Sequence, residues 1–314
     1  MNVEFLVFGI ALVVALVIDL GLLSKKSTTV SIQKALLQTI FWVVLALGFF
    51  TFLWFDRAGD PQPHKIPLEY LSAYLMEWSL SIDNIFVFIL IFSFFRIKEE
   101  YYARVLLIGI LTAIVLRILF ITLGIELIER FHWLLYVFGA ILIVTGIKMF
   151  TAKESHNESL ADNKIYKFII RFIPVSPDDH GGKFVVKQNG KRYYTSLFVV
   201  VIMLAATDIV FALDSIPAVF AISQDSLVVY TSNIFAVLGL RSLFFLLRGA
   251  IDKFSYLPQG IAVVLIFIGV KMLIEMWYTV PIYISLIVIV ICIVGSILYS
   301  INKADEKLDN EIKS

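Results

Sequence analysis

Charged residues are scarce in this chain: Asp, Glu, Lys and Arg make up 16% of its 314 residues, against about 25% in a typical soluble domain. Hydrophobic residues account for 60%. This composition excludes a soluble globular domain and predicts an all-α polytopic membrane protein, because helices satisfy their own backbone hydrogen bonds in lipid. The net charge of +1 gives no indication of a nucleic-acid partner.

Residue types that commonly hold transition metals or carry out catalysis are also few. The single cysteine, Cys292, cannot form a disulfide within the chain. The chain lacks the Gly-x-Ser-x-Gly motif of serine hydrolases and the His-Glu-x-x-His motif of metalloproteases, so we expect neither an enzyme nor a permanently bound cofactor. A zinc or copper site built from His and Cys is not expected, because all four histidines fall in predicted loops or at helix ends: His64, His132, His156 and His180.

Apolar segments long enough to cross a bilayer, which takes roughly 20 helical residues, occur nine times. They cover residues 3–23, 32–54, 68–95, 103–126, 131–150, 196–222, 227–250, 256–275 and 280–301. A polar segment, 151–194, separates the fifth from the sixth, and a short charged tail, 302–314, follows the ninth. Lys and Arg are concentrated there and in every second loop. The positive-inside rule therefore predicts an N-terminus outside and a C-terminus in the cytoplasm.

The polar segment 151–194 contains one sign of regular structure. Asn189 and Gly190 lie between two runs of β-prone residues and predict a small hairpin over residues 184–195. This hairpin is too small to form a domain, so the segment is interpreted as a cytoplasmic connector.

Two polar motifs interrupt the long apolar segments. The first is Glu77-Trp-Ser-Leu-Ser-Ile-Asp83-Asn84, and the second is Asp208-Ile-Val-Phe-Ala-Leu-Asp214-Ser215-Ile-Pro217. In both, two acids stand six positions apart and a small polar residue follows the second. Each acid costs about 2.5–3.5 kcal/mol at the centre of a bilayer. We therefore expect the acids to share a hydrated site or to bind a cation.

Carboxylate, amide and hydroxyl oxygens are the ligands that suit Mn²⁺, Mg²⁺ or Ca²⁺. Pro217 predicts a locally unwound helix in the second motif, because proline leaves a carbonyl group without its usual partner. The first motif has no such proline and should be straighter. The predicted metal ligands are Glu77, Asp83, Asn84, Asp208, Asp214 and Ser215, with Asp19, Ser81, Arg117 and Arg241 as accessory groups or counter-ions.

Structural explanations for the same residues remain open. Asp83 and Asp214 can form buried ion pairs with Arg241 and Arg117, and Glu77 and Asp208 can cap a broken helix. Asp19 can pair with a lysine at the end of the first helix. Two further lysines lie near helix ends, where their long side chains are expected to reach the interface: Lys148 and Lys271.

The two motifs belong to an internal repeat. Gly109 to Arg117 matches Asn233 to Arg241, and Gly146-Ile-Lys-Met matches Gly269-Val-Lys-Met in the same order. Each copy has three helices, so the second copy must be inverted in the membrane, as in many secondary transporters. The predicted organisation is two peripheral helices (1–66), the first repeat (67–150), the connector (151–194), the second repeat (195–276), and the last helix with its tail (277–314).

Together, the two acidic motifs and the Gly-x-Lys-Met sequences resemble the TerC family, including its Alx-type members, from Asp19 to Met272. The resemblance implies a bacterial inner-membrane protein of the LysE-like transporter superfamily. It also implies association with Mn²⁺ export, with metal supply to proteins outside the cytoplasm, or with tellurite resistance. Many members carry Glu three residues before Asp208, where this chain has Ala205. One candidate ligand or proton site is therefore missing here.

We expect a transporter that exports a divalent cation, Mn²⁺ first and Ca²⁺ or Mg²⁺ as alternatives, through a carboxylate site at the membrane midplane. Coupling to protons through one of the acids is an option. The expected partners are the metal ion and the lipid bilayer. An alternative is a membrane scaffold that delivers metal to, or docks, a membrane or secretion-machinery partner through residues 151–194. An intramembrane aspartyl protease using Asp83 and Asp214 is disfavoured, because neither acid has a Gly-x-Gly-Asp context.

Overall fold

The computed structural model of this chain describes residues 3–18, 30–131, 133–151, 175–176, 181–188, 191–248, 256–274, 277–278 and 280–313. Some helical residues are described by their backbone alone. Asp83 and Asp214 are among these, so their side chains lie outside the described part, as does the whole of Asp19.

The described residues form nine helices, and each overlaps one of the apolar segments predicted from the sequence. Their bounds are α1 Val3–Ile18, α2 Ile32–Asp56, α3 Lys65–Phe94, α4 Glu99–Arg130, α5 Leu134–Thr151, α7 Ser196–Ile222, α8 Ser226–Leu247, α9 Leu257–Ile274 and α10 Ile282–Lys313. Six helices of the described part are long and apolar enough to cross a membrane, and the bent α7 makes a seventh. The chain is therefore an all-α polytopic membrane protein, and crossing by all nine helices stays a prediction.

A bend divides α7 at the second acidic motif. The parts Ser196–Ala212 and Ser215–Ile222 meet at an angle of 41°, and Pro217 lies just after the bend. Proline has no N–H to donate and its ring pushes against the preceding turn, so a kink is expected there. The first motif lies in α3, a single helix of 30 residues. The proline thus accounts for the bend in the second motif. The first motif contains no proline and lies in an unbroken helix.

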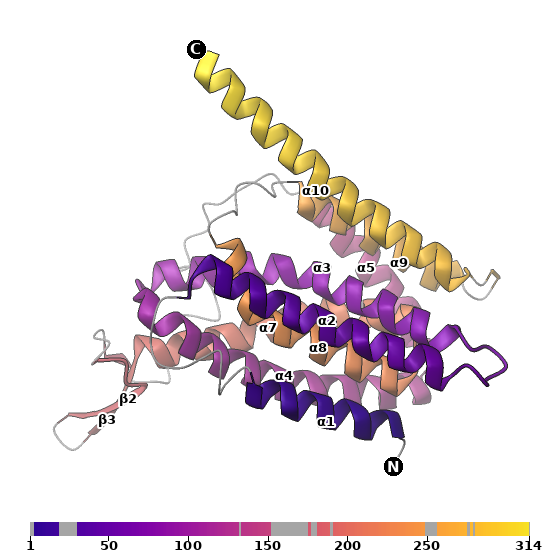
Figure 1. Cartoon of the computed structure of the whole chain (residues 1–314), viewed down its shortest axis with the longest axis horizontal. Helices are drawn as coiled ribbons and strands as arrows, with labels where there is room; N and C mark the ends of the chain where they lie inside the picture. Colours follow the sequence, from indigo (N-terminus) through magenta and orange to yellow (C-terminus); the bar gives the residue numbers. More distant parts are fainter. Residues whose placement is uncertain are drawn as a thin grey trace.

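A small sheet lies at one end of the helical bundle (Figure 1). Its strands are β1 Val175–Ser176, β2 Val185–Gln188 and β3 Lys191–Thr195, in the order β1-β3-β2. The pair β2 and β3 is the predicted antiparallel hairpin, although its turn residues lie outside the described part. The parallel strand β1 was not predicted, because two residues carry no detectable alternation. Arg104 of α4 links the bundle to the segment before β2, because its Nη1 donates a hydrogen bond to the Gly182 carbonyl at 3.1 Å.

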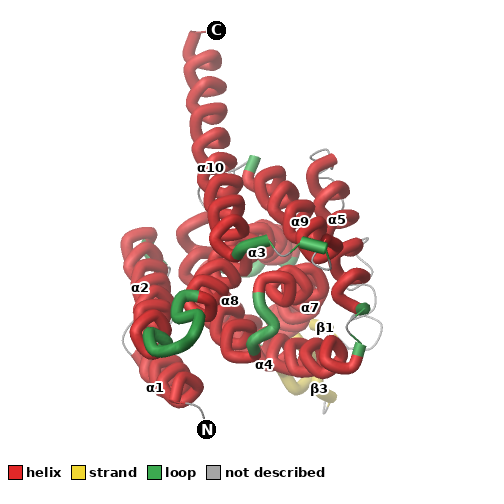
Figure 2. The backbone as a smooth tube through the Cα atoms, turned by 90° about the vertical axis from the view of Figure 1, so that its right-hand side faces the viewer, coloured by secondary structure: helices red, strands yellow, loops and turns green. Residues whose placement is uncertain are grey.

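The helices form a bundle with α7 and α8 inside it. Viewed from one end, α1 and α2 lie on one flank, and α5 and α9 lie on the other (Figure 2). The helix α3 packs against α8, α4 packs against α7, and α5 packs against α9. Nearly every residue of α8 is buried, which agrees with a helix that is apolar on all sides. The two acidic motifs, on α3 and α7, therefore lie in the interior.

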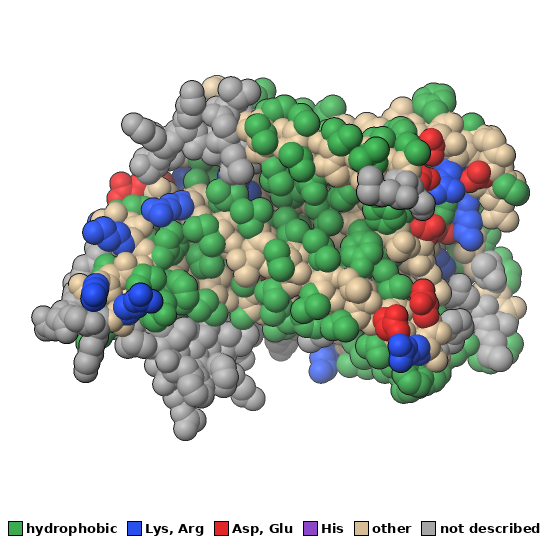
Figure 3. Space-filling model, turned by 90° about the horizontal axis from the view of Figure 1, so that it is seen from below, with side chains coloured by type: hydrophobic (Ala, Val, Ile, Leu, Met, Phe, Trp, Pro, Cys, Tyr) green, Lys and Arg blue, Asp and Glu red, His purple; other side chains and the backbone are tan. Residues whose placement is uncertain are grey.

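Hydrophobic side chains form a band across one face of the bundle. On the face drawn in Figure 3, charged side chains gather at the two ends and hydrophobic side chains cover the middle. The Lys and Arg side chains dominate the end that carries the sheet, whereas the opposite end mixes both charges. Large exposed apolar side chains such as Val17 and Val115 would be unfavourable in water but suit contact with lipid.

Glycines allow α5 and α9 to cross closely. A methyl group added at Gly146 would lie 2.8 Å from the carbonyl oxygen of Ala262, and one added at Gly269 would lie 2.6 Å from that of Gly139. Small residues at helix crossings are a common way for membrane helices to gain packing contacts. No larger side chain fits at Gly146 or Gly269 without moving a helix.

The last helix is longer than the sequence predicted. The backbone of α10 continues to Lys313, through the segment that was predicted as a charged tail. This segment contains Ala, Glu, Lys and Leu without Gly or Pro, and these residues favour continued helix. Figure 1 shows the end of α10 extending away from the bundle.

Candidate functional site

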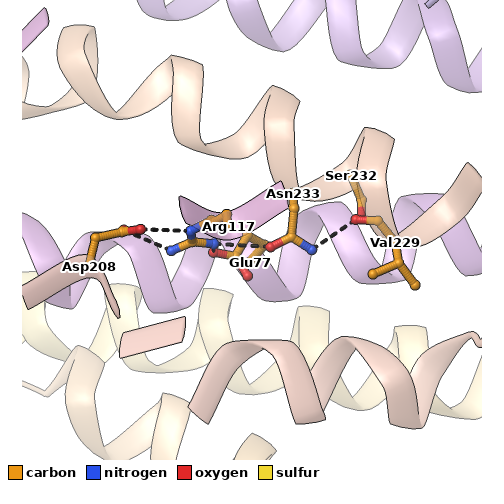
Figure 4. Close-up of polar contacts among 6 residues, drawn as sticks. All are labelled: Glu77, Arg117, Asp208, Val229, Ser232 and Asn233. Carbon is orange, nitrogen blue, oxygen red and sulfur yellow. Dashed lines mark hydrogen bonds and ion pairs between the residues drawn. The ribbon is translucent and has the colours of Figure 1, made fainter. Parts of the chain in front are cut away.

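The first acids of the two motifs meet in the middle of the bundle. Glu77 on α3 is fully buried and Asp208 on α7 is 2% exposed. Arg117, from α4, is also 2% exposed and lies between them (Figure 4). One residue from each of three helices thus contributes a charge to the same buried place.

The guanidinium of Arg117 uses several donors at once. Its Nε and Nη2 donate to the two carboxylate oxygens of Asp208 at 3.0 and 2.9 Å. Its Nη1 donates to Glu77 Oε1 and, at 3.0 Å, to Asn233 Oδ1. The two-point contact with Asp208 matches the planar fork of an arginine and is stronger than a single hydrogen bond. We call Glu77, Arg117, Asp208 and Asn233 the polar cluster.

Asn233 is the member of the polar cluster that the sequence did not single out as a site residue. It lies on the buried helix α8, and its Nδ2 donates to the Val229 carbonyl at 3.0 Å, which orients the amide oxygen towards Arg117 (Figure 4). One signal was available. Asn233 begins the repeat segment that ends at Arg241, and it is an amide in an otherwise largely apolar stretch.

The electrostatics of the polar cluster explain how carboxylates persist inside the bundle. A buried ion is expensive unless it is paired and hydrogen bonded. Two carboxylates and one guanidinium leave one negative charge if all three are ionised. Arg117 therefore acts as a counter-ion, and the acids that it contacts are the first of each motif. Arg241, which matches Arg117 in the repeat predicted from the sequence, is also buried, at 6% exposure.

Three buried oxygens near the two motifs have no hydrogen-bond partner among the described residues. They are Glu77 Oε2, Ser81 Oγ and Ser215 Oγ. Leaving such a group unsatisfied typically costs about 1–3 kcal/mol, so native proteins rarely do so without a reason. Ser81 lies one helical turn after Glu77, and Ser215 follows Asp208 by two turns. These atoms are the kind of ligands that a hard divalent cation takes.

The structure describes the side chains of four of the six predicted metal ligands, and their role as ligands stays a prediction. Glu77 and Asp208 are brought together, and Asn84 and Ser215 are buried, each at 2% exposure. The side chains of Asp83 and Asp214, together with Asp19, lie outside the described part. Within the described side chains, no group of three His, Cys, Asp or Glu residues is arranged to hold a metal.

A cavity of about 860 Å³ opens at the end of the bundle opposite the sheet. It lies between the start of α3, the end of α7, α9 and the start of α10, and Glu69, Ser223 and Lys271 are among its lining residues. Ser223 Oγ donates to Glu69 Oε2 at 2.5 Å, and Lys271 Nζ donates to the Ala221 carbonyl at 3.1 Å. Lys271, on α9, is therefore buried against the end of α7. The sequence predicted instead that its side chain reaches the membrane interface.

These features define a class: a polytopic membrane protein with a buried carboxylate–guanidinium cluster between helices of two similar segments. The chain belongs to the TerC family of integral membrane proteins, because the sequence model of that family matches residues 63–308. The match includes both acidic motifs, Arg117 and Arg241.

Relatives with the same extent are found in several bacteria. An uncharacterized membrane protein of Myxococcus xanthus is 43% identical over 96% of this chain and 91% of its own length, and one of Rickettsia felis is 41% identical over 95% and 97%. A Salmonella typhi protein, Alx, is 42% identical over 89% and 88%, and its name describes it as a candidate membrane-bound redox modulator. No solved structure matches the chain.

Proposed function

We propose that this protein exports a divalent metal cation from the cytoplasm, Mn²⁺ first among the candidates, through a site in the middle of the bundle. The observation that carries the proposal is the meeting of Glu77 and Asp208 in the interior. The same two motifs also contain buried oxygens that lack partners among the described residues. Buried ionisable groups in a membrane protein generally mark an ion pathway.

The proposed ligand set consists of oxygen atoms. Glu77, Asp208, Asn84 and Ser215 supply it from the described side chains, and the proposal adds Asp83 and Asp214 from the sequence motifs. Such a set suits Mn²⁺, Ca²⁺ or Mg²⁺ better than a soft metal, because it contains no thiolate or imidazole. The metal is the cargo here, and its binding would replace most of its water shell.

The packing of the helices supports an inverted repeat. If α3, α4 and α5 correspond to α7, α8 and α9, the contact of α3 with α8 corresponds to the contact of α7 with α4. A two-fold relation would produce this exchange. Repeats of this kind, with a site where they meet, allow alternating access by rocking of one repeat against the other.

The residues at the crossing of α5 and α9 are consistent with the same two-fold relation between the proposed repeats. Gly146 faces Ile266 and Ala262, which stand three and seven positions before the matching Gly269. Gly269 in turn faces Ile143 and Gly139, which stand three and seven positions before Gly146. A pair of helices related by a two-fold axis would meet in this reciprocal way.

We also propose that all nine helices lie in or across a bacterial inner membrane, with the N-terminus outside. The basic end of the molecule, which carries the sheet, would then face the cytoplasm in accordance with the positive-inside rule (Figure 3). The cavity beside Glu69 would face the outside and would receive the metal on its release.

The test is a flux measurement in proteoliposomes loaded with Mn²⁺. Asp208→Asn, Asp83→Asn and Asp214→Asn should each reduce Mn²⁺ flux by tenfold or more, since each removes a charged ligand. Glu126→Gln is the matched control, because Glu126 is an exposed carboxylate on α4 paired with Arg130. Undiminished flux in all three aspartate variants would refute the site. Proton flux measured in the same vesicles would decide whether protons are coupled.

The scaffold hypothesis remains the second candidate, and one observation favours it. The hairpin of β2 and β3 projects from the bundle and exposes the basic residues Lys183, Lys187 and Arg192 (Figure 1). Removal of residues 184–195 should then abolish delivery of metal to a partner while Mn²⁺ flux persists. The redox role in the name of Alx would need a different chemistry in this chain, because one cysteine cannot form an internal dithiol couple.

A further inference from the structure

We infer that Arg117 is a tethered competitor of the transported metal: its guanidinium occupies the carboxylates of the empty transporter, leaves when a metal binds, and returns when the metal is released. This inference rests on the proposed function and goes beyond it, because it gives one residue a defined position at each stage. It predicts that removal of the guanidinium strengthens metal binding and impairs turnover.

The first argument is that the guanidinium and a metal need the same atoms. Both oxygens of Asp208 and one oxygen of Glu77 already accept hydrogen bonds from Arg117. A divalent cation binds oxygens at about 2.0–2.6 Å, which is closer than a hydrogen-bonded nitrogen. The two cations would also repel each other strongly in a buried site. Arg117 and a metal therefore cannot both hold the two oxygens of Asp208 and Oε1 of Glu77.

The second argument is that part of the ligand set is left free by Arg117. The oxygen Oε2 of Glu77 has no partner among the described residues, while its Oε1 accepts from the guanidinium. The hydroxyl oxygens of Ser81 and Ser215 are likewise buried and without partners in the described part. An arriving metal can take these atoms first and then displace the guanidinium from the shared ones.

The third argument is that the structure provides a neutral place for the displaced guanidinium. Asn233 Oδ1 accepts from Arg117 at 3.0 Å, and the hydrogen bond from Asn233 to the Val229 carbonyl fixes that amide. A neutral acceptor can keep the guanidinium after the carboxylates bind metal, without competing for the metal as a third carboxylate would. In the first repeat the matching position is Gly109, which has no side chain. This arrangement therefore serves Arg117 in particular.

The experiment measures Mn²⁺ affinity by calorimetry on the purified full-length protein, and Mn²⁺ flux in proteoliposomes, for the same set of variants. Arg117→Gln should bind Mn²⁺ at least tenfold more tightly and transport it at least tenfold more slowly than the unaltered protein. Arg117→Lys, which keeps the charge but loses the two-point contact, should fall between them. Arg130→Gln is the matched control, because Arg130 is an exposed arginine on the same helix and pairs with Glu126.

A double-substitution cycle separates competition from a general effect of charge. Asn233→Leu should weaken Mn²⁺ binding when Arg117 is present, because the guanidinium loses its neutral acceptor. In the Arg117→Gln background the same change should have no effect on affinity. An equal loss in both backgrounds would overturn the inference, since Asn233 would then act on the metal or on the fold directly.

Two results decide between the inference and the proposed function. Mn²⁺ flux in the unaltered protein, together with Arg117→Gln and Arg117→Lys variants that bind Mn²⁺ no more tightly, would overturn the inference alone. If Arg117→Gln does not fold, as judged by circular dichroism and gel filtration, Arg117→Lys carries the same comparison. An absence of Mn²⁺ binding and flux in the unaltered protein and all variants would overturn the proposed function and the inference with it.

Discussion

Arg117 and Asp208 form a two-point contact, with Nε and Nη2 at 3.0 and 2.9 Å from the two carboxylate oxygens. The pair joins α4 to α7, and Asp208 lies about one helical turn before the bend in α7. Any movement of α4 against α7 must therefore preserve or break this contact.

Removal of the Ser215 hydroxyl should lower the affinity for Mn²⁺ without lowering the free energy of unfolding. Its Oγ is buried without a partner among the described residues, so Ser215→Ala should leave the free energy of unfolding unchanged or raise it by about 1 kcal/mol. Mn²⁺ affinity should fall at the same time, because a ligand oxygen is lost. Thermal unfolding in detergent and calorimetry would measure the two effects.

Ser285→Ala is the control for this prediction. Ser285 lies on α10 and belongs to neither acidic motif, and its Oγ is also buried without a partner in the described part. This variant should show the same small effect on stability and no change in Mn²⁺ affinity. Equal affinity losses in both variants would contradict the assignment of Ser215 as a ligand.

Gly269→Ala should force α5 and α9 apart. The added methyl group would stand 2.6 Å from the Gly139 carbonyl oxygen, a backbone atom that cannot swing away as a side chain can. Overpacking of this kind costs about 1–3 kcal/mol, and the thermal midpoint should fall accordingly. Gly146→Ala should behave alike, since it meets the Ala262 carbonyl in the same way.

Gly295→Ala provides the matched control for the crossing of α5 and α9. It lies on α10, and a methyl group there would meet no atom within 4 Å. Its thermal midpoint should stay the same or rise slightly, because Ala favours helix over Gly. A comparable loss of stability at both sites would show that helix propensity, and not the close crossing, decides the result.

Pro217→Ala should straighten α7 and slow transport. Proline inside a helix costs about 3 kcal/mol in an exposed case, so the variant is expected to be at least as stable as the unaltered protein. The 41° bend would then diminish, and the oxygen ligands after the bend would move relative to Asp208. Electron cryomicroscopy of the variant and Mn²⁺ flux would report the two changes.

Pro258→Ala is the corresponding control, because Pro258 stands in the first turn of α9, where a helix needs no N–H from it. Flux and helix geometry should not change. Normal flux in Pro217→Ala with a demonstrably straight α7 would mean that transport does not depend on the bend.

Lys271→Met should loosen the end of α7. The ammonium group of Lys271 donates to the Ala221 carbonyl in the last turn of that helix, where carbonyl groups lack partners within the helix. Loss of this bond should lower the free energy of unfolding by about 1–3 kcal/mol. Lys148→Met, at the exposed matching position of α5, should have little effect on the same thermal measurement. Equal losses would contradict a specific capping role.

The sequence alone determined that this chain is a helical membrane protein, because composition and the length of apolar runs depend on no tertiary contact. It also placed the bend at Pro217 and the hairpin before α7, since both follow from local chemistry. The strand β1 and the helical continuation of α10 were not predicted, because their weak local patterns did not distinguish them from loops.

Only the tertiary structure decided which charges meet. The sequence named Arg117 as a counter-ion, but residues 77, 117, 208 and 233 are brought together by the packing of α3, α4, α7 and α8, and no spacing along the chain encodes that contact. The same applies to Lys271, whose burial depends on the end of α7 lying beside α9. A polar residue within a long apolar segment is predicted to lie inside the membrane protein. Which residue it pairs with depends on the packing of helices that are distant in the sequence.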